Sequence, residues 1–152
     1  MRFLLFIILL FTLFASCKKD KFTTNGALAF SNDTVIFDTV FTQVGSSTKA
    51  FKIYNTHNEN IRISKIYIAG GEASKYRINI NGFSGRVFSD IEIAPNDSLW
   101  GFAEVTLDPN NVNTPVIVTD SIIFETNGIK QDVDLVAFGQ DANFLYPEPV
   151  IS

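Results

Sequence analysis

The chain has 152 residues, 16 acidic and 12 basic side chains, and a formal net charge of −4 at pH 7. This balance argues against nucleic acid as a partner, because binding to a phosphate backbone calls for a basic surface. The chain has one cysteine, so no internal disulfide can hold a fold together.

An apolar segment begins almost at the N-terminus. Arg2 supplies one positive charge, residues 3–14 are almost all apolar, and the small residues Ala15 and Ser16 follow. This run is too short to span a bilayer, which takes about 20 residues, but it fits the apolar core of a secretory signal peptide. Residues 1–16 are therefore predicted to be a cleaved signal peptide.

The single cysteine comes directly after this segment. Cys17 follows Leu13-Phe14-Ala15-Ser16, a string that resembles the lipobox of bacterial lipoproteins. The resemblance implies cleavage between Ser16 and Cys17, diacylglycerol on the thiol, and a third acyl chain on the new amino group, which together give durable anchoring. The alternative is an ordinary signal peptide that leaves a free thiol in an oxidising compartment, where it is a liability.

Charged residues follow the cysteine. Lys18, Lys19 and Asp20 begin an exposed tether that is expected to extend over 17–25. These residues resemble the sorting signal that sends Bacteroidota-type lipoproteins to the outer face of the outer membrane, although there is a single acid. A plain solvated spacer is the alternative. The expected location is the cell outer membrane, with the outward or periplasmic side left open.

The remaining chain has the length of one domain and the composition of an all-β protein. Residues 17–152 are rich in Ile, Val, Phe, Thr and Asn, and no segment keeps a helical period for three turns. Short alternating runs separated by turn residues predict strands. These runs are 27–30, 34–40, 47–54, 61–68, 76–80, 87–93, 99–107, 116–125 and 131–138.

Eight or nine strands without crossover helices predict an antiparallel two-sheet sandwich of immunoglobulin-like type over 26–140, with a C-terminal linker over 141–152. Ser64-Lys65 is expected to hold a bulge, because the isoleucines before and after it alternate out of phase. Asn127-Gly128 is expected to form a hairpin turn. Trp100 and the phenylalanines are expected in the core or at sheet edges.

Several strings resemble the N-terminal immunoglobulin-like module of a family of Bacteroidota-type surface lipoproteins. In order, they are 38–49, 51–55, 68–71, 93–98, 104–110 and 121–128, so that the resemblance spans about 25–145. In longer members of the family this module precedes a right-handed parallel β-helix. The resemblance implies either a short stand-alone member or the first part of a longer protein.

Candidates for chemistry are few. His57, the single histidine, lies in a polar turn and is expected to be solvated. The carboxylate pairs Asp132 and Asp134, and Asp90 and Glu92, are expected on outward faces of strands. The oxygen-rich run 108–113 lacks the spacing of an EF-hand, and a plain turn is preferred to a calcium site. No nucleophile elbow or phosphate-binding loop is present.

Three functions remain open. The first is a lipid-anchored, non-catalytic module of the cell envelope that acts as a spacer or binds a cell-surface protein or a glycan. The second is the stalk of a larger β-helix protein. The third, an enzyme, is disfavoured, and no cofactor or metal is expected. Exposed aromatic side chains in a row would favour the glycan, but alternation is expected to bury most of them.

Overall fold

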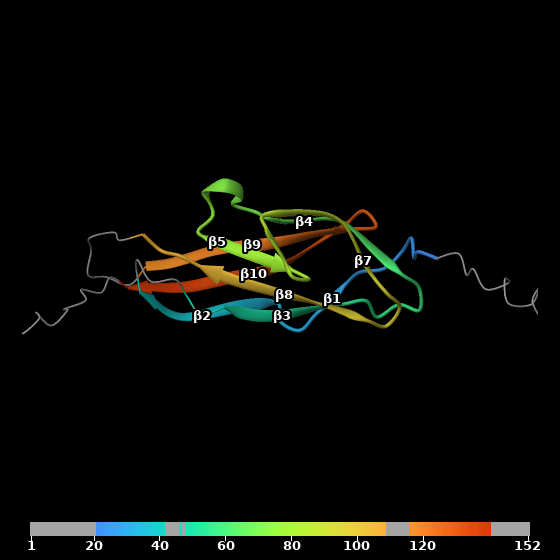
Figure 1. Ribbon diagram of the computed structural model, residues 1–152, viewed down its shortest axis with the longest axis horizontal. Coiled ribbons are helices and arrows are strands. Elements are labelled where there is room, and N and C mark those ends of the chain that lie inside the picture. Colours follow the sequence, from blue (N-terminus) through green and yellow to red (C-terminus); the bar gives the residue numbers. More distant parts are fainter. Residues whose placement is uncertain (1–20, 42–45, 47, 109–115, 141–152) are drawn as a thin grey trace, which may run out of the picture.

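The computed structural model describes residues 21–41, 46, 48–108 and 116–140. These residues form two packed five-stranded sheets (Figure 1), one with strand order β1-β3-β8-β5-β6 and the other with order β2-β10-β9-β4-β7. A short 3₁₀ turn, η2 (Gly71–Ala73), follows β4. The strands are β1 (Ala29–Phe30), β2 (Thr34–Phe41), β3 (Lys49–Tyr54), β4 (Ile61–Ile68), β5 (Tyr76–Ile80), β6 (Phe83–Gly85), β7 (Val87–Ile93), β8 (Ser98–Val105), β9 (Val116–Thr126) and β10 (Ile129–Gln140).

This arrangement confirms the all-β immunoglobulin-like sandwich, with one departure from the expected pairing. Strands β2 and β10 run parallel, with Val35 opposite Leu135, whereas the other strand pairs described are antiparallel. Consecutive strands joined by a tight turn must run antiparallel, but β2 and β10 lie at opposite ends of the domain sequence and no hairpin joins them. The expectation of a purely antiparallel sandwich was wrong for this pair.

Alternating side chains form the core between the two sheets. In β3, Phe51 and Ile53 are buried while Lys52 points outward, as expected. In β4 the pairing with β9 shifts between Ile63 and Lys65, which confirms the bulge. The bulge restores the phase of the strand, so that all four isoleucines of β4 are buried.

Two β-hairpins are connected by Asn-Gly turns. Asn127 (φ 52°) and Gly128 (φ 77°) connect β9 to β10, which confirms the expected turn. Asn81 (φ 51°) and Gly82 (φ 90°) connect β5 to β6 in the same way. Two consecutive residues with positive φ are typical of the type I′ turn, whose twist matches that of the strands. The chain after this turn forms the short strand β6.

Trp100 lies neither in the core nor at a sheet edge, where it was expected, because it is 49% exposed on the internal strand β8. Phe83, which is 70% exposed, lies on the edge strand β6. In β8 the inward positions belong to Gly101, Ala103 and the following Val105, so Trp100 faces outward. Both alternating sets of this strand contain apolar residues, and the sequence pattern alone therefore does not identify the buried set.

The described chain enters and leaves the sandwich at opposite ends (Figure 1). Lys21 and Phe22 lie beside Asn60 at one end, which we call the proximal end. Strand β10 then runs from the Asn127-Gly128 turn to Gln140 at the other, distal end. Its 12 residues separate the two ends by about 40 Å.

Among the described residues, no helix has the length and apolar character needed to cross a membrane.

Candidate functional site

The residues predicted to carry the lipid anchor lie outside the described ranges. These are the cleavage-site residues Ser16 and Cys17 and the candidate sorting residues Lys18, Lys19 and Asp20. Lipidation at Cys17 therefore stays a prediction. What the structure describes is the way in which the chain immediately after them joins the sandwich.

Residues 21–25, expected to be part of the tether, lie against the proximal end. Phe22 forms a parallel bridge with Asn60, where Thr23 N donates to Asn60 O (2.9 Å) and Asn60 N donates to Lys21 O (3.0 Å). The guanidinium of Arg62 lies 4.4 Å from the centre of the Phe22 ring. Lys21 also pairs with Glu59, and this bond raises the pKa of the lysine. The first described residues, Lys21 to Thr23, thus contact the sandwich.

His57 is part of this attachment, and the expectation of a solvated side chain was wrong. Its Nε2 lies 3.0 Å from the carbonyl oxygen of Ala27, and its backbone N donates to Asn55 Oδ1 (3.0 Å). The ring packs so closely on Gly26 (φ +136°) that a β-carbon there would lie 2.5 Å from His57 Cε1. His57 therefore holds the entering chain rather than reaching into solvent.

Asn55 ties the proximal loops together. Its side chain is buried, and Nδ2 lies within hydrogen-bond distance of the carbonyl oxygens of Glu59 (2.8 Å), Ile93 (3.1 Å) and Ala94 (2.9 Å). A buried amide that satisfies several backbone carbonyls fixes loops that have no regular pairing of their own. Nothing in the sequence distinguishes Asn55 from the other polar residues of the turn 55–60.

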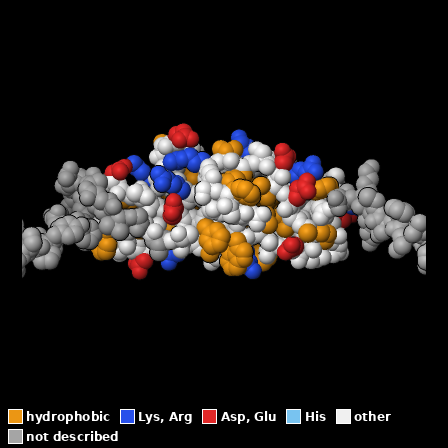
Figure 2. Space-filling view, in the orientation of Figure 1, with side chains coloured by type: hydrophobic (Ala, Val, Ile, Leu, Met, Phe, Trp, Pro, Cys, Tyr) orange, Lys and Arg blue, Asp and Glu red, His pale blue; other side chains and the backbone are white. Residues whose placement is uncertain are grey.

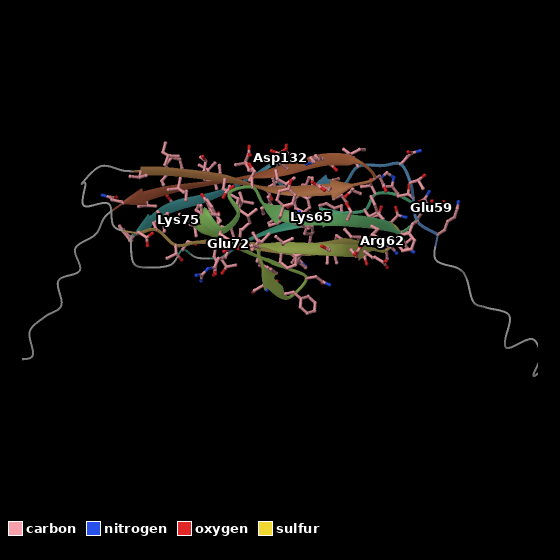
Figure 3. All side chains as sticks on the ribbon, turned by 90° about the horizontal axis from the view of Figure 1, so that it is seen from above. Glu59, Arg62, Lys65, Glu72, Lys75 and Asp132 are labelled. Atoms are coloured by element: carbon pink, nitrogen blue, oxygen red, sulfur yellow. The ribbon has the colours of Figure 1, made fainter. Side chains whose placement is uncertain are left out.

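The acidic residues considered for catalysis lie on outward faces, as predicted. Asp132 and Asp134 are exposed on β10, and Asp132 is labelled in Figure 3. Asp90 and Glu92 are exposed on β7, where Glu92 pairs with Arg62 at 2.7 Å. Within the described ranges, no three His, Cys, Asp or Glu side chains gather in a way that could hold a metal ion. Of the run 108–113, only Asp108 is described, and it pairs with Lys75 (2.5 Å).

An open groove of about 700 Å³ lies on the outer side of the β8, β5 and β6 strands. We call it the outer groove. The register of the paired strands determines which side chains meet there. Arg77 on β5 lies opposite Glu104 on β8, and Asn79 on β5 lies between Phe102 on β8 and Ser84 on β6. Its walls include the side chains of Thr48, Arg77, Asn79, Ser84, Phe102 and Glu104.

Hydrogen bonds orient the polar groups on the β6 side of the outer groove. Asn79 Oδ1 accepts from Gly82 N (2.9 Å), and Asn79 Nδ2 donates to Ser84 Oγ (3.2 Å). Since the serine oxygen accepts this bond, its own hydroxyl proton stays available to a ligand. Arg86 is occupied elsewhere, since its Nη1 donates to the carbonyls of Gly71 (2.5 Å) and Ser74 (3.3 Å).

An aromatic pair continues the outer groove along β8. The rings of Trp100 and Phe102 are stacked, with centroids 6.2 Å apart and an interplanar angle of 21°. Lys52 on β3 lies over the Trp100 ring, with Nζ 4.4 Å from its centre. Figure 2 shows hydrophobic side chains gathered over the middle of β3 and β8. Exposed aromatic groups beside a polar groove are typical of ligand-binding surfaces.

Tyr76 has a strongly shifted pKa, but it belongs to the core. Burial, helped by the charge of Asp120, raises the pKa of its phenol to about 12. The hydroxyl donates to Val118 O (2.7 Å), and the ring packs on Phe37 with centroids 5.8 Å apart. The shift therefore reflects burial in the sandwich rather than a role in chemistry.

Comparison with known proteins identifies the fold and no family. No family model and no curated protein matches the chain. A family 123 glycoside hydrolase from Clostridium perfringens superposes with a TM-score of 0.51 at 9% identity, over 76% of this chain and 27% of the hydrolase. A Porphyromonas gingivalis W83 protein of unknown function gives 0.48 at 10% identity over 84% and 51% of the two chains. The E. coli chaperone DraB gives 0.46 at 7% identity over 78% and 56%. The chain thus spans about a quarter to just over half of these proteins.

Proposed function

We propose that the protein is a lipid-anchored, non-catalytic module of the bacterial outer membrane, of the Bacteroidota surface-lipoprotein type, that acts as a spacer or binding domain. The observation that carries this proposal is the relation between the predicted anchor and the sandwich. The chain that follows Cys17 is held at the proximal end from Lys21 onward, whereas β10 ends at the distal end.

The attachment keeps the proximal end near the membrane. Three residues separate Cys17 from Lys21, and the intervening chain reaches at most about 14 Å. The hydrogen bonds of Lys21 and Thr23 to Asn60 and the packing of Phe22 under Arg62 hold the next residues against the sandwich. A lipidated Cys17 would therefore bring the loops around Asn60 close to the lipid headgroups.

The opposite end then points away from the bilayer. Figure 3 labels Glu59 and Arg62 near the proximal end and Glu72 and Lys75 farther toward the distal one. Any segment or partner joined beyond Gln140 would be held about 40 Å farther from the membrane than the point of entry. This geometry also suits the second candidate, the stalk of a longer surface protein, because a following domain would be carried outward.

Two matched threonines test this orientation. Thr56 lies in an exposed proximal loop and Thr106 directly after β8 near the distal end, and both side chains are exposed. Thr56→Cys and Thr106→Cys would each be labelled with a dye in the lipidated full chain, whose Cys17 sulfur is blocked by the acyl group. The labelled proteins would be placed in vesicles that carry a headgroup quencher.

We expect strong quenching of the dye at position 56 and weak quenching at position 106. Equal quenching at both positions would contradict the spacer geometry while leaving the anchor intact. If the wild-type chain did not bind to vesicles, the predicted lipid anchor itself would be contradicted. Protease added to intact cells distinguishes the two faces of the outer membrane, because only an outward-facing domain is digested.

A further inference from the structure

We infer that the outer groove, together with the Trp100–Phe102 pair, is a binding site for a neutral oligosaccharide. This inference rests on the proposed binding role and specifies its ligand. A pyranose ring has C–H groups on its faces and hydroxyl groups around its rim, so it is complementary to an aromatic surface bordered by mixed hydrogen-bond donors and acceptors.

The aromatic surface has the required position and stability. Trp100 and Phe102 point outward from alternate positions of β8, and Phe102 itself lines the outer groove. Trp100 contacts both Lys52 on β3 and the ring of Phe102, and these contacts restrict its motion. Because the side chains that meet a ligand are already ordered, little conformational entropy is lost on binding.

The polar side chains of the outer groove supply both kinds of hydrogen-bonding partner. Arg77 is a donor and Glu104 an acceptor, and neither side chain belongs to an ion pair or a side-chain hydrogen bond among the described residues. The Ser84 hydroxyl has a free proton, and the Asn79 amide retains one unused donor. A sugar hydroxyl donates and accepts at once, and it needs such mixed partners.

The charges favour a neutral ligand over an anionic one. Arg77 and Glu104 lie opposite each other in the register of β5 and β8, so their charges offset each other within the outer groove. Arg86, the other cation beside it, has its Nη1 committed to backbone carbonyls and lies 3.8 Å from Glu72. Lys52 adds a positive charge at the aromatic pair, where its Nζ lies over the Trp100 ring, and the test below therefore includes an acidic saccharide.

The backbone geometry disfavours a peptide ligand. An extended peptide binds by adding its main-chain hydrogen bonds to a free sheet edge. The floor of the outer groove is instead the face of β5 and β8, whose backbone groups pair with each other and with the neighbouring strands β3 and β6. The edge strand β6 borders the outer groove, and the test below therefore includes a peptide. Across β8, β5 and β6 the side chains span about 10 Å, which accommodates one or two sugar rings.

The test measures binding to the full chain purified in detergent. Probes are cellohexaose, xylohexaose and mannohexaose as neutral saccharides, hexagalacturonate as an acidic one, and an acidic hexapeptide. We expect millimolar or tighter binding of at least one neutral saccharide. Trp100→Ala should weaken it about tenfold or more, as for an aromatic group at the centre of a binding site. The matched control is Phe138→Ala, which removes an exposed aromatic side chain (41% exposed) from the other sheet.

Two charge-removing variants separate the neutral from the acidic ligand. For a neutral saccharide, Arg77→Gln and Glu104→Gln should both weaken binding, because each removes a charged hydrogen-bonding partner. For an acidic ligand, Glu104→Gln would instead strengthen binding. A common melting temperature would show that the variants remain folded.

The proposal is overturned if no neutral saccharide binds, if only hexagalacturonate or the peptide binds, or if Trp100→Ala and Phe138→Ala bind equally well. Detergent-purified protein binds independently of the bilayer, so a failure here leaves the anchor and the spacer geometry untouched.

Discussion

Phe51 and Gly101 face each other across β3 and β8, and the phenyl ring occupies the space that a side chain at position 101 would need. A β-carbon on Gly101 would lie 2.6 Å from Phe51 Cε2. We predict that Gly101→Ala lowers the free energy of unfolding by about 1–3 kcal/mol, the usual cost of overpacking a core. Denaturant unfolding measures the change.

A double-mutant cycle tests whether the clash with Phe51 is the cause. Phe51→Leu removes the ring, and Gly101→Ala should then cost much less than it does in the wild-type protein. Equal costs in the two backgrounds would show that the two positions are energetically independent and that backbone effects dominate.

Asn55 provides a second prediction. Asn55→Asp would put a carboxylate against the carbonyl oxygens of Glu59, Ile93 and Ala94, which now accept from the amide. At neutral pH we expect a loss of about 3 kcal/mol or more, because the buried carboxylate oxygen that replaces Nδ2 would face three acceptors, while His57 N continues to donate to the other oxygen only. Asn58→Asp, an exposed change in the same loop, should cost less than about 0.5 kcal/mol.

The loss at Asn55→Asp should depend on pH. The buried carboxyl group would have a folded-state pKa above its unfolded value, so the variant regains stability as the pH falls and the group becomes protonated. A loss that does not change between neutral and acidic pH, relative to wild type, would contradict this account of the Asn55 contacts.

Tyr76 provides a prediction at alkaline pH. Tyr76→Phe removes the hydroxyl that donates to Val118 O, and we expect it to cost about 1–3 kcal/mol near neutral pH because the carbonyl loses its partner. Tyr54→Phe, a half-buried tyrosine, serves as the matched control. Chemical denaturation of the three proteins measures the difference.

The raised pKa of the Tyr76 hydroxyl predicts how the free energy of unfolding falls as the pH rises. The folded-state pKa of about 12 lies above the usual pKa of 10.0 for a tyrosine phenol. The unfolded chain therefore releases this proton first, and the contribution of Tyr76 is full below pH 10 and is lost as the pH rises toward 12. The difference in stability between wild type and Tyr76→Phe should shrink over this range. A constant difference would contradict the burial of the phenol.

Gly26 and His57 test how the entering chain is held. A side chain on Gly26 is disfavoured by its positive φ and by the His57 ring. We expect Gly26→Ala to increase hydrogen exchange at Thr23 and Asn60, whose amides bond across the proximal end. His57→Ala should restore part of the protection in the double variant, because it removes the clash but not the backbone strain. Unchanged exchange in Gly26→Ala would show that this contact does not hold the tether.

Local patterns predicted much of the fold. The bulge in β4 was predictable because its isoleucines change phase at Ser64, and the β9–β10 hairpin because Asn-Gly is a strong turn signal. The parallel pairing of β2 with β10 was not predictable in this way. It joins strands about 100 residues apart, and no local turn specifies their direction.

The outer groove depends on the same kind of non-local information. Arg77, Ser84 and Glu104 lie on three strands and meet only through the register of β5 with β6 and β8. The available signal was Trp100-Gly101-Phe102-Ala103, in which the small residues take the inward positions and leave the aromatic ones outside. Gly101 and Ala103 can be assigned to the inward face only when Val105 and Leu107, on the same alternating set, are known to be buried.

The lipid anchor at Cys17 is the central claim, and intact mass spectrometry tests it most directly. Protein extracted from membranes with detergent would be compared with a Cys17→Ser variant. We predict a wild-type mass equal to residues 17–152 plus acyl chains, and a variant that lacks the acyl chains and leaves the membrane fraction. A wild-type mass without acyl chains, or one that retains residues 1–16, would contradict the anchor.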